Sequence, residues 1–232
     1  MATDAQTSRA FERDLGELRA LVAEMGGFAE AAIDGAIEAL GRRDLGRAAR
    51  IVEEDRRLDA MELDLERRVL DLIATRTLPA EVLREVLAAL KIAGVVERIG
   101  DYAKNIAKRV PLLVETRGIQ PLSVLPAMAR ATAEMVRGAL DAYAARDASA
   151  AERVCADDRV VDDFYNSLFR ALLTYMMENP HHISASTHLL FIAKNLERIG
   201  DHATNIAEMV HYAATGVQMG ERMRGFDALA AA

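Results

Sequence analysis

The sequence predicts an all-α protein built as two tandem, duplicated, antiparallel three-helix bundles. Three observations carry this prediction: the composition favours helices, one segment occurs twice, and apolar residues recur with the period of packed helices. Of the 232 residues, 51% are hydrophobic but only 5% are aromatic, with 5 prolines and no tryptophan. This composition supports a sizeable core made of helices rather than sheets.

An internal repeat divides the chain into two halves. Residues 97–107 (ERIGDYAKNIA) and 197–207 (ERIGDHATNIA) agree at 9 of 11 positions. The offset between the halves is 100 here and 103 further upstream, so the first half has the longer connector. Because the same unit occurs twice, we expect one bundle over residues 1–117 and a second, with a short C-terminal tail, over residues 118–232.

Each half is predicted to contain three helices. In the first half they cover residues 10–42, 45–76 and 80–115, and in the second half residues 124–145, 148–178 and 184–214. Pro79 and Pro180 lie in the links that precede the third helices, because a helix interior does not tolerate proline. Further breakers punctuate the junction between the halves, namely Pro111, Gly118, Pro121 and Pro126.

The third helix of each half carries an apolar seam. Apolar residues recur there at alternating spacings of four and three, which is typical of helices packed like coiled coils. The seam residues are Ile92, Val96, Ile99, Ala103, Ile106 and Val110 in the first half, and Ile192, Leu196, Ile199, Ala203, Ile206 and Val210 in the second. Three such helices joined by short links pack as an antiparallel bundle.

Carboxylates four residues apart lie outside this seam. Glu97 and Asp101 are about 40° apart around their helix, with Asn105 one turn further along. Like charges at this spacing destabilise a helix, and the glycine between them costs about 1 kcal/mol more. Since both halves keep this combination, we expect an offsetting role, and we predict an outward-facing acidic ledge that binds metal.

The preceding helix is predicted to complete each metal site. Asp55 and Asp59 have the same spacing, and an antiparallel neighbour would bring four carboxylates together. Oxygen ligands favour hard or borderline ions such as Mg, Mn, Ca, Fe or Zn, and four charges favour more than one ion per site. The predicted ligands are Asp55, Asp59, Glu97, Asp101, Asp158, Asp162, Glu197 and Asp201, with Asn105 and Asn205 as weaker candidates.

Other functions find less support in the sequence. A net charge of −7 without a clustered basic face argues against nucleic-acid binding. No catalytic residue is expected, because phosphate loops, Ser elbows and Cys-His pairs are missing. A carboxylate-bridged metal-storage protein or metalloenzyme is the alternative, although the Glu-x-x-His spacing of 208–211 has no counterpart in the first half. The histidines His182, His188 and His202 are expected to be surface or packing residues.

Location is predicted from the lack of membrane signals. The first residues carry no apolar signal region, and no run approaches the roughly 18 apolar residues of a membrane span. The single cysteine, Cys155, precludes an internal disulfide. We therefore expect a cytoplasmic protein with no direct membrane insertion.

The two ERIGD segments resemble the paired signature of the PhoU family of phosphate signalling complex proteins. The resemblance covers roughly residues 12–215, including 23–27, 55–62 and 173–178. It implies two related three-helix bundles whose carboxylate pairs bind multinuclear metal clusters, with iron, zinc, nickel and others among the metals. It also implies a homodimeric regulator that links the nucleotide-binding subunit of the phosphate ABC transporter to the sensor histidine kinase PhoR and represses the phosphate-starvation response.

Overall fold

A computed structural model describes residues 2–115 and 123–219, with side chains from residue 11 onward. These residues form no strand. The long helices are α1 (Ala2–Arg42), α2 (Leu45–Thr75), α3 (Ala80–Ala107), α5 (Leu125–Ala145), α6 (Ala148–Glu178) and α7 (Ile183–Thr215), and the short elements are α4 (Val110–Leu113) and the 3-10 turn η2 (Pro180–His182). The predicted all-α class is confirmed.

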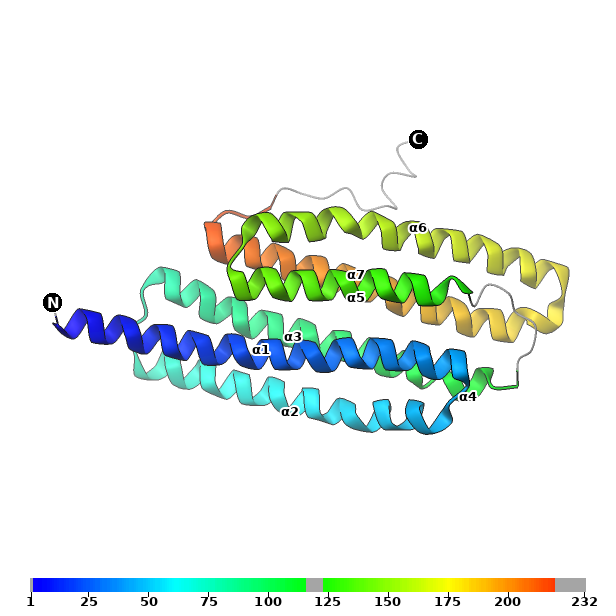
Figure 1. Cartoon of the computed structure of the whole chain (residues 1–232), viewed down its shortest axis with the longest axis horizontal. Helices are drawn as coiled ribbons and strands as arrows, with labels where there is room; N and C mark the ends of the chain where they lie inside the picture. The colour runs from blue at the N-terminus through cyan, green and yellow to red at the C-terminus, as the bar shows by residue number, and fades with distance from the viewer. Residues whose placement is uncertain (1, 116–122, 220–232) are drawn as a thin grey trace.

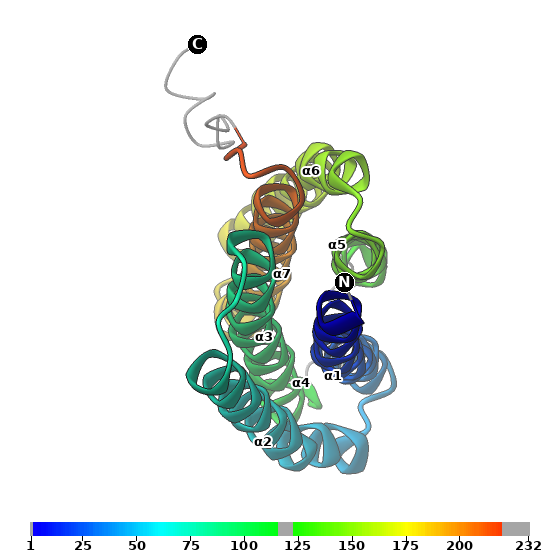
Figure 2. The same cartoon turned by 90° about the vertical axis from the view of Figure 1, so that its left-hand side faces the viewer.

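The two halves form two bundles that lie side by side. The helices run along the long axis of the molecule, with α1, α2 and α3 in one bundle and α5, α6 and α7 in the other (Figure 1). Seen end on, α1 lies beside α5 and α3 beside α7, whereas α2 and α6 lie at opposite outer edges (Figure 2). One apolar core runs through both bundles. The predicted boundary between residues 117 and 118 lies outside the described residues.

Aspartates start the middle helix of each bundle. Asp44 precedes α2, and its Oδ1 accepts a hydrogen bond from the backbone N–H of Arg47 at 2.9 Å. Asp147 precedes α6, and its Oδ1 accepts from the N–H groups of Ser149 at 2.9 Å and Ala150 at 3.0 Å. These caps satisfy backbone donors that have no partner inside the helix. The repeat therefore preserves the start of the middle helix.

The predicted seams form the centre of the core. All their residues are at most 2% exposed: Ile92, Val96, Ile99, Ala103, Ile106, Val110, Ile192, Leu196, Ile199, Ala203, Ile206 and Val210. This confirms the seam prediction. Across the described ranges, no helix combines the length and apolar character that a membrane span requires.

The main departure from the predicted helices is at the end of the third one. Instead of continuing through residues 80–115, α3 ends at Ala107, and α4 follows after a turn. Pro111 explains the break, because it lacks an N–H and its ring clashes with the carbonyl four residues earlier, which is that of Ala107. His211 stands at the equivalent position in α7, which continues to Thr215. The other predicted ends agree within one residue, except that α1 already begins at Ala2.

Candidate metal centre

Carboxylates gather at equivalent places in the two bundles, between the second and third helix of each. The first carboxylate cluster consists of Asp55, Asp59 and Glu62 from α2 and Glu97 and Asp101 from α3. The second carboxylate cluster consists of Asp158 and Asp162 from α6 and Glu197 and Asp201 from α7. The structure therefore brings together, within each half, the carboxylates that the sequence predicted.

A glycine on the third helix lets the aspartates of the second helix come close. A Cβ atom added to Gly100 would overlap Leu58 and would lie 3.7 Å from Asp55 Oδ1. A Cβ on Gly200 would lie 3.6 Å from Asp158 Oδ1. The glycines that weaken the isolated helices thus have a packing role, because they seat one aspartate of each half against the neighbouring helix.

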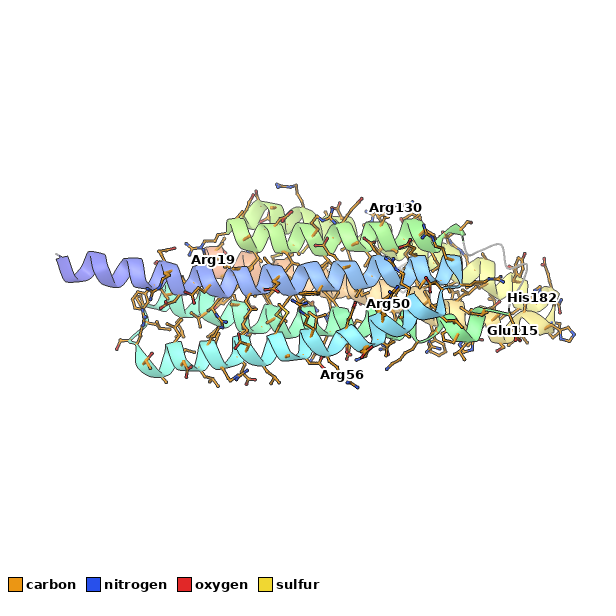
Figure 3. All side chains as sticks on the ribbon, turned by 60° about the horizontal axis from the view of Figure 1, so that its bottom comes forward. Arg19, Arg50, Arg56, Glu115, Arg130 and His182 are labelled. Carbon is orange, nitrogen blue, oxygen red and sulfur yellow. The ribbon has the colours of Figure 1, made fainter. Side chains whose placement is uncertain are left out.

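Asp55 is more buried than an outward ledge would allow. Its side chain is 6% exposed, whereas that of Asp101 is 43% exposed. Arg56, the next residue along α2, is exposed and points away from the bundle (Figure 3). The predicted ledge is therefore partly an interhelical contact, since α2 packs directly over Gly100. The angular position of Asp55 around its own helix did not predict this burial, because the burial depends on where the neighbouring helix lies.

Lys104 bridges the two helices within the first cluster. Its Nζ donates to Asp55 Oδ2 at 2.5 Å and also to Asp101 Oδ1. Burial opposes the charge of Lys104, but the hydrogen bonds to Asp101 and Asp55 outweigh it and raise the lysine pKa above its usual value. Lys104 is absent from the predicted site, although its position three residues after Asp101 puts both residues on one helix face.

The glutamates of the first cluster, which Lys104 does not contact, lie in a region of excess negative charge. Burial, followed by the charges of Asp101 and Glu62, raises the pKa of Glu97 to about 7. Burial also raises the pKa of Glu62, together with the charges of Glu66 and Asp59. Glu62 was another residue missing from the prediction. Carboxylates in this state gain free energy by binding a proton or a cation.

The second cluster is neutralised differently. Lys194 donates to Glu197 Oε1 at 2.6 Å, and its charge opposes the burial that raises the Glu197 pKa. Burial and the charge of Asp201 raise the pKa of Asp162. At the position equivalent to Lys104 stands Thr204, whose hydroxyl donates to the backbone carbonyl of Asp201 at 2.6 Å.

The donor set fits a hard cation. The clusters offer carboxylate oxygens with excess negative charge, and such oxygens are the usual ligands of divalent metals. In the part of the chain that the structure describes, no three His, Cys, Asp or Glu side chains are arranged to hold an ion as they stand. Asn105 is half-buried, and Asn205 Nδ2 lies 3.4 Å from His202 Nδ1. Metal ligation by the predicted residues stays a prediction.

The histidines without a counterpart in the first half are packing residues. The ring of His202 stacks on Tyr102 with centroids 5.4 Å apart. His182, at the end of the molecule in Figure 3, stacks on a tyrosine ring of α6 at 5.3 Å. Arg109 Nη1 lies 3.1 Å from His188 Nδ1. This confirms the expectation of surface or packing roles.

The repeated bundles and their paired carboxylate clusters define a class of duplicated helical-bundle proteins. The PhoU domain matches residues 22–110 and 125–210, which takes in all the predicted ligands. The chain belongs to the PhoU family. It is 57% identical to the phosphate-specific transport system accessory protein PhoU homolog of Zymomonas mobilis, with 97% of this chain and 94% of that protein covered. The homolog of Caulobacter vibrioides is 44% identical, with 96% and 97% covered.

Solved structures agree with this assignment. The crystal structure of PhoU from Pseudomonas aeruginosa superposes with a TM-score of 0.85 at 35% identity, covering 89% of this chain and 100% of that one. The phosphate transport system regulatory protein PhoU of Streptococcus pneumoniae gives a TM-score of 0.81 at 26% identity, covering 91% and 100%. These relatives are named as accessory or regulatory proteins, and none of these names is that of an enzyme.

Proposed function

We propose that this chain is a regulatory adaptor of phosphate homeostasis that binds metal through its two carboxylate clusters. The observation that carries the proposal is the PhoU domain match, which spans both halves and includes one cluster in each. The relatives that match nearly the whole length of this chain are named as accessory proteins of the phosphate-specific transport system. Membership of this family supports a regulatory role beside the transporter.

The adaptor works in the cytoplasm as a homodimer, with two kinds of partner. It links the nucleotide-binding subunit of the phosphate ABC transporter to the sensor histidine kinase PhoR, and it represses the phosphate-starvation response when phosphate is plentiful. Exposed apolar side chains on the outer helices suit such contacts. They include Leu63 and Leu70 on α2, each 57% exposed, and Phe169 and Leu173 on α6, 41% and 46% exposed.

The metal is proposed to be a multinuclear cluster of Fe, Zn, Mn, Ni or Mg ions. The ligands in the first half are Asp55, Asp59, Glu97 and Asp101, and the second half uses the equivalent residues. When bound, the ions neutralise the clustered carboxylates and tie the second helix of each bundle to the third. Asn105 is a weaker candidate ligand, as is its equivalent in the second half.

Metal analysis tests this part of the proposal. The purified protein should retain metal after desalting, and the double variant Asp101→Ala, Asp201→Ala should lose most of it. A matched control is the pair Asp71→Ala, Asp141→Ala, which removes two exposed carboxylates outside the clusters. Unchanged metal content in the cluster variant would contradict metal binding by these residues.

Experiments in cells test the partners and the repression. A pull-down of the chain at high and low phosphate should recover the transporter subunit and the kinase. Deleting the gene should switch on phosphate-scavenging genes at high phosphate. Normal repression together with normal phosphate uptake in the deletion strain would refute the adaptor role. Light scattering of the purified protein should give the mass of a dimer.

A further inference from the structure

The two carboxylate clusters carry their lysines at different ends. In the first cluster Lys104 lies on the C-terminal side of Asp101, and Thr204 stands at the equivalent position of the second. In the second cluster Lys194 lies on the N-terminal side of Glu197, and Gly94 stands at the equivalent position of the first. The repeat has therefore kept the carboxylates but not the internal cation.

Lys104 is held between two helices. Its ammonium group contacts Asp55 from α2 and Asp101 from its own helix, and the lysine side chain is only 20% exposed. An ammonium group between two carboxylates, one of them buried, supplies the positive charge that a metal would otherwise bring. A metal can use these two aspartates only by displacing the lysine.

Lys194 is held less firmly. It pairs with one carboxylate of its own helix, and its side chain is 41% exposed. Its Nζ also lies 5.2 Å from the centroid of the Tyr165 ring, which stands where the first half has Glu62. The Glu197 side chain is 15% exposed, but Lys194 itself is twice as exposed as Lys104 and contacts one carboxylate rather than two, so an incoming ion displaces Lys194 more easily than Lys104. Thr204 has no ammonium group to offer the aspartates of the second cluster.

We infer that Lys104 is a tethered cation that competes with metal at Asp55 and Asp101, so that the second carboxylate cluster binds a divalent ion before the first. This inference rests on the proposed metal binding. This inference assigns the two repeats unequal roles. In the first repeat a lysine occupies the aspartates, and in the second repeat the aspartates are available to a metal ion.

Exchanging the two residues tests the inference. Mn²⁺ is titrated into metal-free protein and followed by calorimetry. The variant Lys104→Thr should bind the ion at the first cluster about tenfold more tightly, and Thr204→Lys should weaken the tightest site about tenfold, each near 1.4 kcal/mol. Lys104→Arg keeps the positive charge and should resemble the wild type. Lys108→Thr removes an exposed lysine one turn further along and serves as the matched control.

Single-site variants assign the tightest ion to one cluster. As single substitutions in the otherwise wild-type chain, Asp201→Ala should abolish the tightest Mn²⁺ site, whereas Asp101→Ala should leave that site intact. If Asp101→Ala removes it instead, or if Lys104→Thr and Thr204→Lys both bind like the wild type, the inference is wrong while metal binding stands. If no variant binds Mn²⁺, the proposed metal binding fails and the inference fails with it. Should Thr204→Lys not fold, because Thr204 is only 1% exposed, Lys104→Thr and the two alanine variants still decide.

Discussion

Tyr102 of α3 and His202 of α7 occupy equivalent positions in the two repeats and stack on each other. Their ring centroids are 5.4 Å apart with an interplanar angle of 20°, and His202 Nε2 lies 3.4 Å from the Tyr102 hydroxyl oxygen. Equivalent residues of two copies meet where the copies are related by a two-fold axis. An approximate two-fold axis therefore passes between α3 and α7 at this pair, and the two carboxylate clusters lie on either side of it.

The stacked pair should stabilise the contact between the bundles. In a double-mutant cycle with Tyr102→Leu and His202→Leu, we expect a coupling free energy of about 0.5–1.5 kcal/mol, the usual range for aromatic pairs. Urea denaturation of the four proteins at pH 7.5 gives the value. Tyr175 stacks on His182, about 30 Å from His202 along α7. Combining Tyr175→Leu with His202→Leu should therefore give additive effects, and equal coupling in both cycles would contradict a specific contact.

The charge state of His202 should make the fold less stable in acid. Burial and the charge of Arg98 lower the pKa of His202 below its usual value, despite the nearby Asp201. Between about pH 6.5 and that lowered pKa, the unfolded chain binds a proton that the folded chain does not. Stability is thus fully present above about pH 6.5 and falls as the pH drops toward the lowered pKa. His202→Phe keeps an aromatic ring and should lose less free energy of unfolding between pH 7.5 and 5.5 than the wild type does.

Glu97 should contribute in the opposite direction. Its pKa rises from 4.5 to about 7, so in this window the folded chain holds a proton that the unfolded chain releases. The wild type therefore loses stability as the pH rises from about 4.5 to 7, and Glu97→Gln removes this loss. Because Glu97 is only half-buried, solvent screening limits the gain of the variant at pH 8 to about 1 kcal/mol.

Chelator-treated protein provides the measurement for Glu97, since bound metal would hold the glutamate ionised. Urea denaturation at pH 5 and pH 8 should show Glu97→Gln close to the wild type at the lower pH and more stable at the higher one. Glu81→Gln, at an exposed position in the first turn of α3, is the control. A variant that is less stable than the wild type at pH 8 would mean that the Glu97 carboxylate stabilises the fold.

The fold followed from the sequence because its signals are local. The seam around Ile99 and Ile199 sets which face of each third helix is buried, and the repeat fixes the number of helices. The sequence did not predict every residue of the carboxylate clusters. Lys104 and Glu62 join the first cluster only because α2 lies against α3 in a particular register, and helical periodicity does not set the register between two helices.

The end of α3 before Pro111 differs from the predicted end at residue 115 for a different reason. Pro111 is one of several helix breakers at the junction, but its clash reaches back to Ala107 and ends α3 there. The burial of Asp55 did not follow from the sequence for a similar reason, because Gly100 opposite it only weakens the helix when that helix is considered alone. Its role is visible only once a second helix packs on it.

Replacing the two equivalent glycines by alanine should have effects of opposite sign. Alanine favours a helix interior by about 1 kcal/mol over glycine. At Gly200 the new Cβ would lie 3.4 Å from Val161, an ordinary contact, so Gly200→Ala should gain about 0.5–1 kcal/mol. At Gly100 the Cβ would overlap Leu58, which is 3% exposed, and overpacking of this kind costs about 1–3 kcal/mol.

The helix gain is common to both variants, so Gly100→Ala should be less stable than Gly200→Ala by the overpacking cost of about 1–3 kcal/mol in urea denaturation with chelator present. The variant Gly100→Ala, Leu58→Ala separates the clash from other effects. It removes the overlapping atom, so adding Gly100→Ala to Leu58→Ala should no longer cost stability. Equal effects at the two glycines would mean that α2 does not press on α3 more closely than α6 presses on α7, and that the burial of Asp55 has another cause.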